Sequence, residues 1–123
     1  AADPELRGHA WRALGGALDM SGEHERAATC YPPSLELFTA TGNEADVAHM
    51  RFRIAASMVM RGEPEAAWPL LENVLQEARL RGSRLGECQA LAYLAQRAEG
   101  RGDHATALEM TLESAAIADW NAA

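Results

Sequence analysis

Apolar residues recur at helical spacing along the whole chain. The residues three or four positions apart are Leu14 and Leu18, Ile54 and Met58, Leu70, Leu71, Val74 and Leu75, Leu91 and Leu94, Leu108 and Leu112. Such spacing gives a helix one apolar face, and no alternating pattern typical of a strand competes with it. The pattern predicts helices at about 5–20, 24–40, 44–61, 64–81, 84–100 and 104–120.

Turn signals divide these helices at a regular interval. A glycine followed by an acidic residue occurs at Gly22, Gly62 and Gly102, a spacing of 40 residues, and a second glycine turn occurs at Gly42 and Gly82. Glycine ends a helix in the left-handed conformation, and the acidic residue favours the N-terminus of the next helix. The turns therefore predict three helical hairpins, at about 5–41, 44–81 and 84–120.

Small residues occupy one shared position in the first helix of each hairpin. These residues are Gly15, Ala55 and Ala95. They would let paired helices approach closely. The predicted fold class is all-α, with three antiparallel helix hairpins stacked into an α-solenoid.

The first hairpin resembles a known repeat. Trp11-x2-Leu14-Gly15-x2-Leu18, followed by Gly22, Ala27 and Tyr31, resembles the tetratricopeptide repeat (TPR) pattern W-x2-L-G-x2-Y, then A-x3-F. The later hairpins keep part of it, at Ile54, Ala55, Met58, Ala67 and Leu71 and at Leu91, Leu94, Ala95, Gly102 and Ala107.

The resemblance implies one TPR-like domain over residues 1–123, built as a right-handed solenoid. Two features depart from the family pattern, because the period is 40 residues rather than 34 and the terminal proline is absent. Repeats with long second helices are similar to those of bacterial transcriptional regulators of the LuxR and antibiotic-regulatory types. A chain that opens without an initiator methionine also suggests a fragment of a longer protein.

Prolines interrupt two of the second helices. Pro32 and Pro33 lie beyond the first turn of the helix predicted at 24–40, where proline removes backbone hydrogen bonds. We expect a kink or break at Cys30 to Pro33, with the helix resuming at Ser34. Pro69 should bend the helix predicted at 64–81.

Charge argues against nucleic acid as a partner. The net charge is -7 and the isoelectric point is about 5.0, whereas phosphate-backbone binding requires excess Lys and Arg. The first helices carry a combined charge of +2 and the second helices -8. No apolar run is long enough to span a bilayer, and no signal peptide is evident. We expect a cytoplasmic protein that contacts neither membrane nor nucleic acid, with Cys30 and Cys88 as reduced thiols.

The resemblance implies that the first helices line a groove for a protein or peptide. The groove residues it selects are His9, Arg12, His49, Phe52, Arg53, Gln89, Tyr93 and Gln96. Arginine would form charge-assisted hydrogen bonds with an acidic peptide, and Phe52 and Tyr93 would offer a stacking surface. Two alternatives stay open: a solvated helix face, or a groove filled by the rest of a longer chain.

Metal and catalytic signatures are not found. His9 and His49 are repeat equivalents about 8–10 Å apart or more, too far for a shared ligand set. The motifs of serine hydrolases, zinc proteases, nucleotide-binding loops and dinucleotide-binding folds are absent. The sequence therefore predicts no enzyme, no metal site and no cofactor.

The last predicted helix raises the prospect of self-association. A solenoid needs a polar terminal cap, yet this helix keeps an apolar face. Leu112 and Trp120 are the predicted contacts of a homodimer, unless Trp120 packs back on Leu80 and Leu85.

The leading hypothesis is an interaction scaffold that senses a partner within a bacterial transcriptional regulator. The alternatives are an autonomous oligomerisation module acting through its terminal helices and, more weakly, a small-molecule sensor.

Overall fold

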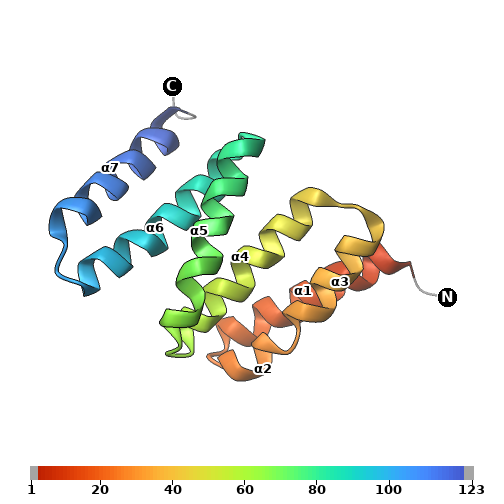
Figure 1. Cartoon of the computed structure of the whole chain (residues 1–123). Helices are drawn as coiled ribbons and strands as arrows, with labels where there is room; N and C mark the ends of the chain where they lie inside the picture. Colours follow the sequence, from red (N-terminus) through yellow and green to blue (C-terminus); the bar gives the residue numbers. More distant parts are fainter. Residues whose placement is uncertain (1–2, 121–123) are drawn as a thin grey trace. The chain divides into compact units, whose positions relative to one another are not determined.

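A computed structural model describes residues 3–120 of the chain, with side chains up to Asp119. Within this range the chain forms seven helices and no strand (Figure 1). The helices are α1 (Pro4–Met20), α2 (His24–Ala28), α3 (Tyr31–Thr41), α4 (Glu44–Met60), α5 (Pro64–Arg81), α6 (Arg84–Gly100) and α7 (His104–Trp120). Five of the six predicted helices are confirmed to within one residue at either end.

The chain divides into two compact units, one ending at Ala67 and the other starting at Trp68. The first contains α1 to α4 and the start of α5, and the second contains the rest of α5 with α6 and α7. The single domain expected from the sequence stays a prediction.

The predicted turns are confirmed at the five turn glycines. Gly22, Gly42, Gly62, Gly82 and Gly102 all have positive φ angles, between 70° and 81°. Residues with a Cβ rarely adopt this left-handed conformation, so glycine suits these helix ends. Several helices begin with a side-chain cap. The caps on α1, α4 and α6 come from Asp3, Asn43 and Ser83, each of which accepts a hydrogen bond from a backbone N–H of the first turn.

The break in the second helix of the first hairpin is confirmed, although it lies slightly earlier than predicted. Helix α2 ends at Ala28, and α3 begins at Tyr31 rather than at Ser34. Pro32 and Pro33 therefore fall in the first turn of α3, where backbone N–H groups have no partner within the helix and proline costs little. Pro69 lies inside α5, which continues without interruption from Pro64 to Arg81.

Two glycines of α1 let α3 pack closely against it in the first unit. The Tyr31 and Phe38 side chains are fully buried, and each lies over a glycine of α1. A Cβ at Gly15 would lie 2.5 Å from the Tyr31 ring, and a Cβ at Gly8 would lie 3.0 Å from the Phe38 ring. Gly8 and Gly15 are seven residues apart on α1, and Tyr31 and Phe38 are seven residues apart on α3. The two contacts are therefore two helical turns apart on both helices. Between them the Ser34 hydroxyl donates to the Gly8 carbonyl oxygen at 2.8 Å.

The second unit packs α6 against α7 around small and branched side chains. Its buried residues include Leu71, Val74 and Leu75 of α5, Ala90, Leu91, Leu94, Ala95 and Ala98 of α6, and Ala107 of α7. Ion pairs also link the helices of this unit. Arg97 of α6 contacts Glu72 of α5 at 2.6 Å, and Arg79 of α5 contacts Glu113 of α7 at 2.9 Å.

Candidate peptide-binding face

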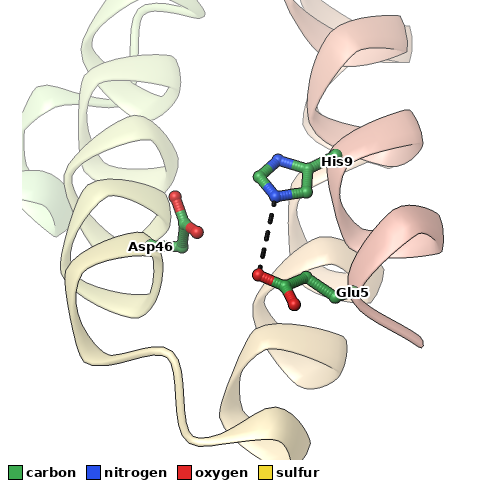
Figure 2. Close-up of side chains that lie close together, drawn as sticks. All are labelled: Glu5, His9 and Asp46. Carbon is green, nitrogen blue, oxygen red and sulfur yellow. Dashed lines mark ion pairs between the residues drawn. The ribbon is translucent and has the colours of Figure 1, made fainter. Parts of the chain in front are cut away.

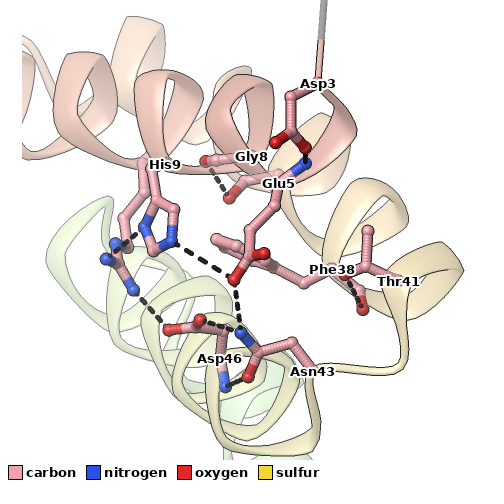
Figure 3. Close-up of polar contacts among 10 residues, drawn as sticks. Asp3, Glu5, Gly8, His9, Phe38, Thr41, Asn43 and Asp46 are labelled. Carbon is pink, nitrogen blue, oxygen red and sulfur yellow. Dashed lines mark hydrogen bonds and ion pairs between the residues drawn. The ribbon is translucent and has the colours of Figure 1, made fainter.

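A cluster of polar side chains lies between α1 and the start of α4 in the first unit (Figure 3). Arg12 of α1 donates to one carboxylate oxygen of Asp46 of α4 at 2.7 Å and to Nδ1 of His9 at 2.7 Å. Asn43 donates to the other Asp46 oxygen at 2.6 Å. The cluster rests on Phe38, whose ring lies 5.0 Å from the His9 ring and 5.6 Å from the Arg12 guanidinium carbon. Arg12 is thus already neutralised by Asp46.

Arg53 differs from Arg12 because it lacks an acidic partner. Its guanidinium carbon lies 5.5 Å from the centre of the Tyr31 ring, a cation–π contact. Among residues 3–119 no ion pair of Arg53 is found, and its buried Nε has no hydrogen-bond acceptor. One terminal nitrogen lies 3.4 Å from where a Cβ on Gly16 would stand, so glycine there leaves the guanidinium room. The result is a half-buried cation on α4 whose buried Nε–H has no acceptor among the described residues.

His49 lies one turn before Arg53 on α4 and is half-buried. Burial lowers the pKa of His49, and the positive charges of Arg53 and Arg12 lower it further, against a smaller opposing effect of Asp46. A pKa below the ordinary value keeps this imidazole neutral at pH 7. Positive charge on this part of α4 therefore belongs to Arg53, with His49 as a neutral hydrogen-bonding neighbour.

The structure places the other predicted groove residues differently. Phe52 is only 9% exposed, so little of its ring is open to a ligand. In the second unit Gln89 and Tyr93 are half-buried and Gln96 is exposed, all on α6. Of the predicted set, the structure thus brings together His9, Arg12, His49 and Arg53 in the first unit. Their roles in binding, and those of the remaining groove residues, stay predictions.

Sequence reasoning missed two acidic residues and one aromatic in the first unit. Asp46 pairs with Arg12, and Asp19 accepts a hydrogen bond from the buried Tyr31 hydroxyl. Burial, reinforced by the bond to Asp19, raises the pKa of Tyr31 well above its ordinary value, so the phenol stays protonated. The ring that contacts the Arg53 guanidinium is therefore uncharged. The signal that could have found Asp46 is its position on α4, three residues after the capping residue Asn43 and three residues before His49.

Leu112, a predicted oligomer contact, lies on α7 and is 60% exposed. Leu108, one turn earlier on the same helix, is also 60% exposed. Trp120 is the last residue of α7, and its side chain lies outside the described residues. None of the helices in residues 3–120 has the length and apolar character that a bilayer-spanning segment requires.

No protein-family model and no curated protein matches the sequence. Among solved structures, the chain is similar to the crystal structure of the TPR domain of Arabidopsis FLU. The TM-score is 0.79 at 18% sequence identity, and the match covers 94% of this chain and 98% of that domain. The all-helical structure and this match show that the chain has the fold of a tetratricopeptide repeat domain.

Proposed function

We propose that this chain is a protein-interaction scaffold and that α4 of its first unit binds an acidic group of a peptide or protein partner. The observation that supports the proposal is the Arg53 guanidinium, which has no acidic partner among the described residues and lies beside the small residue Gly16. A carboxylate can accept two hydrogen bonds from one guanidinium, and such charge-assisted bonds are stronger than neutral ones. His49, kept neutral, would add a further hydrogen bond.

Arg12 has a supporting part in this proposal. Its guanidinium is held by Asp46 and His9, so binding a ligand through Arg12 would require it to leave both partners. Arg53 needs no such exchange. We therefore expect Arg53 to contribute more to affinity than Arg12 does.

Selection from a random peptide library displayed on phage tests the proposal. The wild-type chain should enrich peptides that contain Asp or Glu. Arg53→Gln should weaken the affinity for an enriched peptide by about 10- to 100-fold, because hydrogen bonds to a charged group contribute about 1.5–3 kcal/mol each. Calorimetric titration of the synthetic peptide measures the change.

Arg51→Gln is the matched control, because it removes the same charge from an exposed position two residues earlier on α4. Its affinity for the peptide should remain within about twofold of wild type, as expected of a surface charge. Enrichment of peptides without acidic residues, no enrichment at all, or equal affinities for Arg53→Gln and Arg51→Gln would each contradict the proposal.

We further propose that the scaffold is the sensing segment of a bacterial transcriptional regulator. The support is the 40-residue period and the long second helices, which are similar to those of such regulators. In this setting the acidic partner would be a protein, a peptide or a neighbouring domain, and its binding would alter how the segment docks.

A second function is favoured by the exposed leucines of α7. Leu108 and Leu112 lie one turn apart on α7, and each is 60% exposed. If the chain assembles through this helix, Leu112→Glu should convert a dimer into a monomer, because a buried charge without a partner opposes association. Sedimentation over a range of concentrations measures this. A wild-type chain that stays monomeric, or a Leu112→Glu dimer of unchanged affinity, would exclude assembly through α7.

A further inference from the structure

Three potential metal ligands converge where α1 meets α4 (Figure 2). Glu5 and His9 are four residues apart on α1, and Asp46 comes from the first turn of α4. One ligand atom from each residue lies within 4.8 Å of the others, and Nε2 of His9 is 4.0 Å from a carboxylate oxygen of Glu5. The sequence relates His9 to its repeat equivalent His49, and it does not show that two carboxylates lie beside His9.

We propose that Glu5, His9 and Asp46 bind a divalent transition-metal ion, with Zn²⁺ the best match. One imidazole and two carboxylates form a ligand set that suits zinc, with water at the remaining position. Ligand atoms around tetrahedral zinc are about 3.4 Å apart, given bonds of about 2.1 Å. The cluster therefore needs to contract by about 1 Å. Glu5 is long and its side chain is 51% exposed, so it can move.

Neighbouring side chains already hold these ligands in place through hydrogen bonds and a ring contact, as the residues around a metal's ligands do. Asn43 donates to a carboxylate oxygen of Asp46 at 2.6 Å and to one of Glu5 at 3.2 Å (Figure 3). The His9 ring is held edge-on against Phe38. Two carboxylates from different helices thus share one amide donor directly beside the imidazole.

Arg12 would compete with the metal. Arginine is always a donor, so Nδ1 of His9 accepts from Arg12 and the proton of the neutral ring lies on Nε2. A metal bound to Nε2 moves that proton to Nδ1, where it would face the N–H of Arg12. Metal binding therefore requires the Arg12 side chain to move away from His9. This movement also removes a positive charge that would otherwise repel the metal ion.

Titration with ZnCl₂ in a calorimeter tests the site. The wild-type chain should bind one Zn²⁺. His9→Gln and Glu5→Gln should each weaken binding by more than about tenfold, the lower bound for losing part of a metal site. Arg12→Gln should bind Zn²⁺ about threefold more tightly or better. This last result shows whether Arg12 competes with the metal ion for the three ligands. If Arg12 were instead needed to hold the ligands in place, Arg12→Gln would bind Zn²⁺ more weakly.

His104→Gln is the matched control, because His104 pairs with Glu99 at 3.1 Å but is not part of the three-residue cluster. It should leave Zn²⁺ affinity unchanged. Co²⁺ should give a spectrum without a thiolate charge-transfer band, because Cys30 and Cys88 are not ligands. Circular dichroism checks that each variant is folded. If His9→Gln does not fold, Glu5→Gln still tests the site, because Glu5 is exposed and its substitution does not disturb the core.

The proposal would be overturned by a wild-type chain that binds no Zn²⁺ below millimolar concentration. A thiolate band with Co²⁺, wild-type affinity in His9→Gln and Glu5→Gln, or weaker binding in Arg12→Gln would also overturn it. The result is independent of the proposed function, because repeating the peptide titration in the presence of a chelator measures binding through Arg53 without metal.

Discussion

Replacing Gly15 with alanine should lower the free energy of unfolding by about 3 kcal/mol, the upper part of the range for overpacked cores. The added Cβ would stand 2.5 Å from the Tyr31 ring, a distance at which something must shift. Tyr31 cannot shift easily, because its side chain is 1% exposed and its hydroxyl is hydrogen-bonded to Asp19. Urea denaturation followed by circular dichroism measures the change.

Gly16→Ala is the matched control for Gly15→Ala. It makes the same substitution one residue later in the same helix, where the nearest atom is a flexible Arg53 nitrogen at 3.4 Å. There the higher helix propensity of alanine should stabilise the protein by about 0.5–1 kcal/mol. Equal effects of the two substitutions, in either direction, would mean that α1 and α3 are not in close contact at Gly15.

A double variant tests the cause of the Gly15 effect. At the positions equivalent to Gly15 and Tyr31, the second repeat has Ala55 and Leu71. Combining Gly15→Ala with Tyr31→Leu should therefore cost at least about 1 kcal/mol less than the sum of the single effects, a coupling expected of residues in contact. Strict additivity would argue against a steric origin.

Replacing Phe38 with alanine should lower the free energy of unfolding by about 3–5 kcal/mol. The side chain is fully buried, and its ring contacts Gly8 and His9 of α1. Removing it leaves a cavity between α1 and α3 that the fixed helix backbones cannot close. The same denaturation experiment measures this loss.

Leu37→Ala provides the comparison for Phe38→Ala. Leu37 is the neighbouring apolar residue of α3 and is half-buried. Its truncation should cost clearly less, because part of the side chain is already in water. If Phe38→Ala and Leu37→Ala lower the free energy of unfolding equally, then Phe38 does not hold α3 against α1 as described.

The helices and turns were predictable because their signals are local. The apolar spacing and the glycines at 40-residue intervals depend on nearby residues alone, and five of the six predicted helices agree with the structure to within one residue at either end. The proline pair correctly predicted a break between α2 and α3. Its position was less certain, since a helix can end before a proline pair and restart with both prolines in its first turn.

The candidate sites were less predictable because they depend on contacts between helices. The resemblance selected Arg12 and Arg53 together, but only the structure shows that Asp46 neutralises Arg12 and that Arg53 lacks an acidic partner among the described residues. Likewise, Glu5 and His9 are four apart and could be paired from the sequence. Asp46 joins them only through the packing of the first unit.

The binding role of Arg53 is tested most directly by nuclear magnetic resonance of arginine side chains. The buried Nε–H of Arg53 should exchange slowly enough to be observed, and the Arg53→Gln variant assigns it. Titration with an acidic peptide from the library selection should shift the Arg53 signal more than any other arginine Nε–H signal. An unchanged Arg53 signal at saturating peptide would contradict the proposed function.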